Sequence, residues 1–201
     1  MINEAILQMS YWEIIAALLS IFYISLAIKQ NIWCWIAAFF STLIYSILFF
    51  DATLLMSSFL NAYYLIMAIY GWYSWKIRND YKDSNLKIST LNLSVNAKII
   101  VVLSIISIVL GYYMTNYTNT SYAYLDSTIT IFSLVATYMM TKKILDNWIY
   151  WIIIDSAAIY LYFKKEFYVT SILFLIYTIL AFLAYMEWKK EYKSYQEIDK
   201  S

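Results

Sequence analysis

One carboxylate stands inside an otherwise uncharged stretch of this chain, and aromatic residues share its helical face. Within the apolar stretch Asn147–Phe163, successive steps of three, four and seven place Asp155 on one helical face with three aromatic residues, Trp148, Trp151 and Tyr162. An ionised carboxylate in a bilayer costs about 2.5–3.5 kcal/mol even on a lenient insertion scale, so Asp155 should face the protein interior or water. Indole rings beside a carboxylate suit a flat, positively charged heterocycle. We therefore take Trp148, Trp151 and Asp155 as candidate substrate-binding residues; the alternative is an interfacial Trp pair and an Asp bonded to a neighbouring hydroxyl.

Polar residues form faces in three other apolar stretches. Steps of four, three and four run from Asp126 along one helical face. Asn61 is the one amide expected at mid-membrane, where it can both donate and accept hydrogen bonds. The additional substrate-binding candidates are Asn61, Tyr64, Thr130, Ser133, Thr137 and Tyr177. Helix packing is the alternative for these positions, because small hydroxyl residues let membrane helices approach closely.

Composition places the chain in a bilayer and excludes several kinds of chemistry. Hydrophobic residues make up 63% of the 201 residues and charged residues 13%, whereas soluble domains are nearer half apolar and a quarter charged. There is no His and one Cys, Cys34, which argues against a disulfide framework, a metal site and a His-dependent enzyme. The net charge of +1 gives no general attraction to nucleic acid. We expect a non-enzymatic protein with no cofactor and no bound metal.

The apolar stretches predict an all-α membrane protein with seven transmembrane helices. Each is close to the roughly 17–25 residues that cross the hydrocarbon core, and only closed helices satisfy the backbone there. Asp155 is the only charged residue inside any of them. The predicted spans are Ile14–Ile28, Gln30–Phe50, Ala52–Trp75, Ile99–Leu125, Ser127–Thr141, Asn147–Phe163 and Phe167–Met186.

Basic residues predict the orientation of these spans. Of the 14 Lys and Arg residues, all but Lys164 and Lys165 fall on the side that holds the first, third and fifth connections and the C-terminus. The positive-inside rule then places the N-terminus outside and the C-terminus in the cytoplasm. Glu13 and Asp126 lie at outer helix ends, so we expect them at a mouth or gate. The Trp residues near helix ends are expected as interfacial anchors; these are Trp12, Trp33, Trp35, Trp72, Trp75, Trp148 and Trp188.

An internal repeat appears when the chain is compared with itself without gaps, shifted so that Glu13 falls on Asp126. Other rare residues then coincide: Trp35 falls on Trp148 and Trp75 on Trp188, with further matches at Ser and Tyr positions. We call this separation the repeat offset. It shifts the chain by four helices and so preserves orientation, which makes the repeats parallel, as in one known class of transporters. The predicted plan is 3+1+3: a first three-helix repeat at 1–78, a polar loop and linker helix at 79–122, and a second repeat with a short cytoplasmic tail at 123–201.

Several motifs resemble those of the PnuC family of bacterial vitamin-precursor transporters, over nearly the whole chain. They are Asn31–Trp35, Asn61–Tyr64, Tyr70–Trp75, Asp126 with Ser133, Trp148–Trp151 with Asp155, and Tyr168–Ser171. The resemblance implies the 3+1+3 fold that the family shares with SWEET sugar transporters. It also implies facilitated diffusion of an unphosphorylated vitamin, which a cytoplasmic kinase then phosphorylates and traps.

The resemblance and the candidate pocket together suggest thiamine as the substrate. The nicotinamide riboside branch of the family tends to have Asn and Gln where this chain has Asp155 and Thr137, and a ribose needs several polar partners. A nicotinamide riboside transporter and a proton-coupled vitamin carrier are the alternatives, the second because Asp155 could relay protons. We expect a multi-pass protein of the bacterial inner membrane, whose partners are the vitamin and the lipid bilayer. A homo-oligomer is left open.

Overall fold

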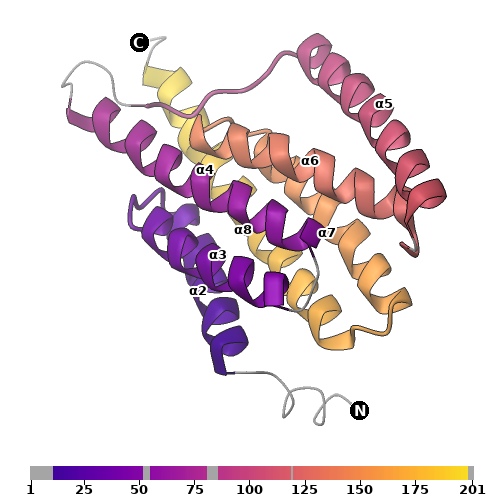
Figure 1. Ribbon diagram of the computed structural model, residues 1–201. Coiled ribbons are helices and arrows are strands. Elements are labelled where there is room, and N and C mark those ends of the chain that lie inside the picture. The colour runs from indigo at the N-terminus through magenta and orange to yellow at the C-terminus, as the bar shows by residue number, and fades with distance from the viewer. Residues whose placement is uncertain (1–10, 52–54, 81–85, 119, 199–201) are drawn as a thin grey trace.

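The chain folds into long helices. The computed structural model describes residues 11–51, 55–80, 86–118 and 120–198. Within these residues lie seven α-helices, one for each predicted span (Figure 1). They are α2 Tyr11–Ile28, α3 Cys34–Asp51, α4 Leu55–Asp80, α5 Leu93–Tyr117, α6 Ala123–Thr141, α7 Asn147–Lys164 and α8 Tyr168–Ile198. The all-helical prediction is confirmed.

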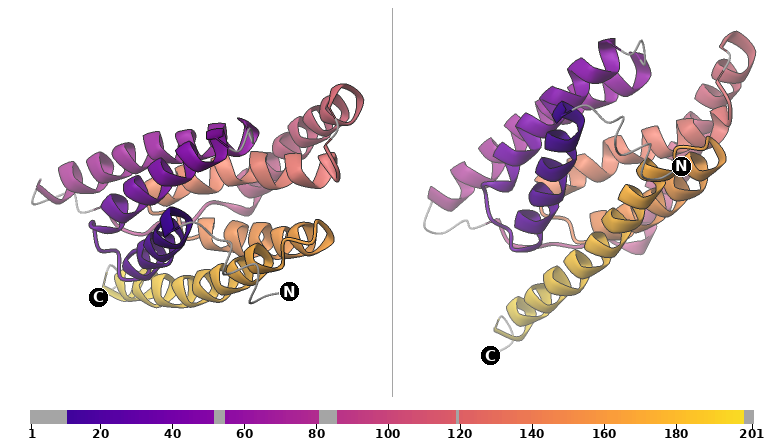
Figure 2. Two further views of the ribbon diagram at one scale, coloured as in Figure 1. Left: turned by 60° about the horizontal axis from the view of Figure 1, so that its bottom comes forward. Right: turned by 90° about the horizontal axis from the view of Figure 1, so that it is seen from below.

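The helices pack as two groups of three, with α5 set apart. In the first unit, α2 to α4, the middle helix α3 packs against both neighbours. In the second unit, α6 to α8, α7 does the same. The two units meet where α2 packs on α8 and where α4 packs on α6. The linker helix α5 packs against α6 and lies at the edge of the bundle in both Figure 1 and Figure 2.

Helix boundaries recur at the repeat offset found in the sequence. The middle helices begin at Cys34 and Asn147 and end at Asp51 and Lys164, so both bounds differ by the same separation, 147 − 34 = 113 and 164 − 51 = 113. Contacts recur as well: the Ser58 hydroxyl donates to the Ser46 carbonyl at 2.8 Å, and the Ser171 hydroxyl donates to the Ile159 carbonyl at 3.1 Å. Matched residues therefore occupy matched places in the two units.

The turns after α2 and α6 have the same backbone geometry. Gln30 and Lys143 adopt left-handed conformations with φ of 50° and 52°. The amide of Gln30 donates to the Ala27 carbonyl at 2.9 Å, and that of Asn31 donates to the Leu26 carbonyl at 3.0 Å. This is the Schellman arrangement, which satisfies the last carbonyls of a helix and turns the chain sharply. Its repetition at Lys143 fixes how α7 leaves α6.

Four helices among the described residues are long and apolar enough to cross a membrane. They are α2, α3, α5 and the part of α8 from Tyr168 to Glu197. The other three helices, α4, α6 and α7, carry much of the predicted polar set, including Asn61, Ser133 and Asp155. Polar residues lower the apolar content of these helices, and they are tolerated in a membrane protein where they face other helices.

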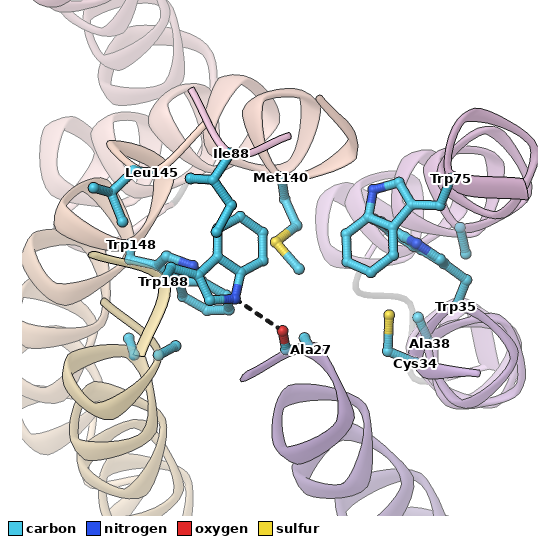
Figure 3. Close-up of a cluster of buried hydrophobic side chains, with 13 residues drawn as sticks. Ala27, Cys34, Trp35, Ala38, Trp75, Ile88, Met140, Leu145, Trp148 and Trp188 are labelled. Atoms are coloured by element: carbon cyan, nitrogen blue, oxygen red, sulfur yellow. Dashed lines mark hydrogen bonds between the residues drawn. The ribbon is translucent and has the colours of Figure 1, made fainter. Parts of the chain in front are cut away.

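Four of the Trp residues expected at the membrane interface lie inside the protein instead. Trp35, Trp75, Trp148 and Trp188 are at most 3% exposed. Trp35 meets Trp75 edge-on with ring centroids 5.3 Å apart, and Trp148 meets Trp188 edge-on at 5.4 Å. We call these four residues the tryptophan layer (Figure 3). The prediction was wrong because closeness to a helix end does not tell which way an indole points, and a buried indole removes a large apolar area from water or headgroups.

The last helix continues where the sequence predicted a short polar tail. α8 is helical to Ile198, and its end contacts other segments. The side-chain amide of Gln30 donates to the Glu191 carboxylate, and so does the Tyr195 hydroxyl. The Tyr192 hydroxyl lies 3.2 Å from that of Thr90, in the segment before α5. These contacts give the polar end of α8 partners that a frayed tail would lack.

Candidate functional site

Two Ser–Tyr pairs cross between the helical units. The Ser20 hydroxyl of α2 hydrogen-bonds the Tyr177 hydroxyl of α8. The Ser133 side chain of α6 hydrogen-bonds the Tyr64 hydroxyl of α4. Ser20 and Ser133 are separated by the repeat offset, and so are Tyr64 and Tyr177, so the two pairs are counterparts at the two interfaces. Three predicted candidates, Tyr64, Ser133 and Tyr177, thus lie at the contacts between the two units.

Asp155 lies between these two pairs. Its side chain is 4% exposed, and it interacts electrostatically with both Tyr64 and Tyr177, one from each unit. Among the residues that the structure describes, no hydrogen bond or ion pair to its carboxylate is found. A buried carboxylate without partners is costly, so this group is available to a ligand that brings a donor or a positive charge.

Two further tyrosines lie near the groups around Asp155, and the sequence reasoning missed both of them. Tyr23 of α2 interacts electrostatically with Tyr64, and Tyr45 of α3 with Tyr177. The repeat gives no signal for either, because their counterparts at the repeat offset are Ala136 and Ala158. Only the step of three from Ser20 to Tyr23, which places both on one helical face, could have identified Tyr23.

Aromatic rings close the centre on the side of α7 and α8. Tyr162 stacks on Phe174 with centroids 5.2 Å apart and an interplanar angle of 9°. Phe174 meets Tyr177 edge-on at 5.7 Å. Such ring contacts hold large side chains in fixed orientations. The Tyr177 hydroxyl is therefore held by packing as well as by Ser20.

The two candidate Trp residues of α7 have different surroundings. Trp148 is 3% exposed, belongs to the tryptophan layer, and has no hydrogen-bond partner for its Nε1 among the described residues. Trp151 is half-buried and packs against both clusters of buried apolar residues, the one that contains the tryptophan layer and the one around Met139 and Ile154. Trp151 therefore keeps ring surface that a ligand could cover, whereas Trp148 is already covered by Trp188.

The remaining substrate candidates mostly bond within their own helices. The Asn61 amide donates to the Ser57 carbonyl at 2.9 Å, and the Thr137 hydroxyl donates to the Ser133 carbonyl at 2.8 Å. Thr130 is half-buried one turn before Ser133, on the same helix. These residues lie about one helical turn from Tyr64 or Ser133, but the polar atoms of Asn61 and Thr137 are already bonded, unlike those of Asp155.

The two acids expected at a mouth lie in the first turns of α2 and α6. Asp126 forms an ion pair with Lys165 at 3.0 Å, which ties the start of α6 to the turn after α7. Glu13 interacts electrostatically with Tyr45, and Asp126 with Tyr162. Each acid, at the start of its helix, thus lies near one tyrosine of the bundle.

The opposite end of the bundle is closed by the tryptophan layer and a polar bridge. The Lys143 ammonium donates to the Gln30 side-chain oxygen at 2.9 Å and lies 4.7 Å from the centroid of the Trp75 ring. Burial lowers the pKa of Lys143, and the nearby Glu191 carboxylate opposes that shift. This bridge joins the turn of the first unit to the turn of the second.

One hollow elsewhere in the described chain makes a poorer substrate site, and no metal site is found among the described residues. A hollow of about 260 Å³ between α5 and α6 is lined by Lys98, Ile99, Val102, Leu103 and Val135. Its apolar lining does not hold the residues that could recognise a polar vitamin, so the geometry favours the centre around Asp155. Within the described residues, no group of three or more His, Cys, Asp or Glu side chains gathers as metal ligands do.

Comparison with known families and curated proteins gives consistent matches. The model of the family described as nicotinamide mononucleotide transporter matches residues 10–190. The nicotinamide riboside transporter PnuC of Escherichia coli (strain K12) is 24% identical, over 90% of this chain and 86% of its own length. The riboflavin/roseoflavin transporter RibM of Streptomyces davaonensis is 20% identical, over 88% of this chain and 83% of its own length.

A solved structure shares the fold. The crystal structure of the vitamin B3 transporter PnuC matches with a TM-score of 0.75 at 17% identity. The match covers 92% of this chain and 83% of the other. The arrangement of the helices is therefore that of a known membrane transporter.

Proposed function

The chain belongs to the nicotinamide mononucleotide transporter family, and from that premise we propose that it carries nicotinamide riboside, an unphosphorylated vitamin precursor, across the bacterial inner membrane. The observation that carries the proposal is the buried Asp155 between Tyr64 and Tyr177, where the two helical units meet. Transporters with parallel repeats hold their substrates between the repeats near the midplane. A positively charged ring beside Asp155 would supply the partner that this carboxylate lacks.

This proposal replaces the thiamine expected from the sequence. The relatives above are named for nicotinamide riboside and riboflavin, which both carry a sugar-derived polyhydroxyl group that thiamine lacks, and this supports nicotinamide riboside over thiamine. The expectation of thiamine assumed that ribose hydroxyls need amide partners. Tyrosine and serine hydroxyls both donate and accept hydrogen bonds, and Tyr23, Tyr64 and Tyr177 bring several of them to the centre.

We assign the candidate residues to parts of this substrate. Asp155 faces the pyridinium ring, and Trp151 stacks on it. Tyr64, Tyr177 and Ser133 bind the ribose hydroxyls. The residues that orient these groups from behind are Asn61, Thr130, Thr137 and Trp148. Glu13 and Asp126 form the outer mouth, where acidic groups attract a cation.

The fold belongs to the same proposal. Two parallel three-helix repeats, 1–78 and 123–201, flank the linker 79–122 in a SWEET-like 3+1+3 plan. The recurrence of helix bounds at the repeat offset supports it. With the N-terminus outside, the mouth acids face the exterior and the tryptophan layer faces the cytoplasm.

Transport is facilitated diffusion, and a cytoplasmic kinase then traps the substrate. The test uses purified protein in proteoliposomes with labelled nicotinamide riboside, thiamine and riboflavin. Nicotinamide riboside should enter until its concentrations inside and outside are equal, and the other two should compete poorly. Accumulation above the external concentration under an imposed proton gradient would favour the proton-coupled alternative, and preferred uptake of thiamine would restore the first expectation.

A further inference from the structure

One acidic side chain is buried at the centre of this protein without a cation beside it. Asp155 is 4% exposed, and within the described part of the chain no basic group lies within ion-pair distance of its carboxylate. Three basic residues of the described chain are not exposed, and all are engaged elsewhere: the Lys142 ammonium donates to the Tyr70 hydroxyl. Lys143 bonds Gln30 and covers Trp75, and Lys165 pairs with Asp126.

The scaffold itself does not require this acid. The counterpart of Asp155 at the repeat offset is Thr42, whose hydroxyl donates to the Ala38 carbonyl of its own helix at 2.8 Å. The first unit thus builds the same helix, with the same bounds, around a neutral residue. Since a buried unpaired carboxylate is costly and the first unit is built without one, the presence of Asp155 points to a ligand.

The two polar groups that flank Asp155 cannot replace a cation. Tyr64 and Tyr177 interact with it electrostatically from opposite units, but each phenol is already bonded to a serine. Phenols are neutral hydrogen-bonding groups and leave the negative charge uncompensated. A ligand that brings a positive charge offsets the cost of burying the ionised carboxylate.

We propose that Asp155 is the counter-ion that makes this site select positively charged, N-substituted heteroaromatic precursors over neutral molecules of the same shape. This inference rests on the proposed function and assigns the chemical class of the substrate. A neutral ligand bound beside Asp155 would leave the carboxylate without a partner. The site therefore discriminates by charge, because binding a neutral isostere leaves the penalty in place.

The experiment compares two ligands that differ in charge and hardly in shape: nicotinamide riboside, a pyridinium cation, and its reduced dihydropyridine form, which is neutral. Binding to the purified full-length protein is followed by Trp fluorescence. The parent protein should bind the cation at least 10-fold more tightly than the neutral form. Asp155→Asn should weaken cation binding by about 10- to 100-fold, the range expected for a hydrogen bond to a charged group, and leave binding of the neutral form unchanged or tighter. Asp155→Glu keeps the charge and should retain the preference, and Ser156→Ala, an exposed neighbour, should change neither.

The outcomes separate this inference from the proposed function. A parent protein that binds both forms equally overturns the counter-ion role and leaves riboside transport standing; this measurement needs no variant to fold. Equal weakening of both ligands by Asp155→Asn also overturns it, since that would be a general loss of the site. A parent protein that binds neither form refutes the proposed function itself.

Discussion

Gln30 and Lys143, which are counterparts at the repeat offset, hydrogen-bond each other at 2.9 Å. The bond joins the turn after α2 to the turn after α6 and so links the two groups of three helices directly. Both residues have left-handed backbones at the same turn, with φ of 50° and 52°. The pair therefore joins two turns of matching geometry beside the tryptophan layer, with an amide on one side and an ammonium on the other.

The contact between Gln30 and Lys143 should be measurable as a coupling energy. In a double-mutant cycle of Gln30→Ala and Lys143→Ala, we expect about 0.5–1.5 kcal/mol of coupling in thermal unfolding of the detergent-solubilised protein, the usual range for one hydrogen bond. The control cycle combines Gln30→Ala with Lys29→Ala, a change at an exposed neighbour, and the two effects on the free energy of unfolding should be additive. Additivity of the Gln30 and Lys143 changes would show that the contact contributes nothing.

The two Ser–Tyr pairs should contribute alike to substrate binding. Tyr64→Phe and Tyr177→Phe each remove one hydroxyl from counterpart positions. Each should weaken nicotinamide riboside binding by about 2- to 10-fold, as expected for the loss of one hydrogen bond. Tyr113→Phe on α5, where the side chain is 57% exposed, is the matched control. Unchanged affinity in both variants would place the substrate away from the unit interface.

Gly71 should be intolerant of any side chain. A β-carbon there would lie 2.5 Å from Cε2 of Trp35, inside the tryptophan layer. Since overpacking of a dense interior typically costs about 1–3 kcal/mol, Gly71→Ala should lower the melting temperature by several degrees. Tyr73→Phe on the exposed side of α4 should not. Trp35→Phe should partly suppress the effect, because its ring is smaller; a fully stable Gly71→Ala protein would refute the close contact.

The proposed orientation can be tested with single cysteines. Cys34 is the one native cysteine and is fully buried, so it should give little background. In right-side-out membrane vesicles, a membrane-impermeant maleimide should label Ser121→Cys, between α5 and α6. It should label Ser194→Cys, near the end of α8, only after the membrane is opened. Labelling of both positions from the same side would contradict the predicted topology.

The sequence by itself determined the helices and much of the site's composition. Long apolar stretches with few charges leave the backbone no alternative to helices in a bilayer, and all seven predicted stretches correspond to helices in the structure. The match of Trp35 to Trp148 and of Ser20 to Ser133 at one offset predicted counterpart positions, and the helix bounds follow that offset. The isolated acid Asp155 was visible because a charge is rare in such a stretch.

Only the tertiary structure decided which faces meet. The sequence placed Trp35 and Trp148 near helix ends but could not tell whether they point to lipid or inward, since both environments accept an indole. It also gave no signal for Tyr45, whose counterpart is Ala158, because its place beside Tyr177 depends on how the first unit packs against α8. Periodicity defines a face along one helix, whereas the partner of that face depends on contacts between residues far apart in the chain.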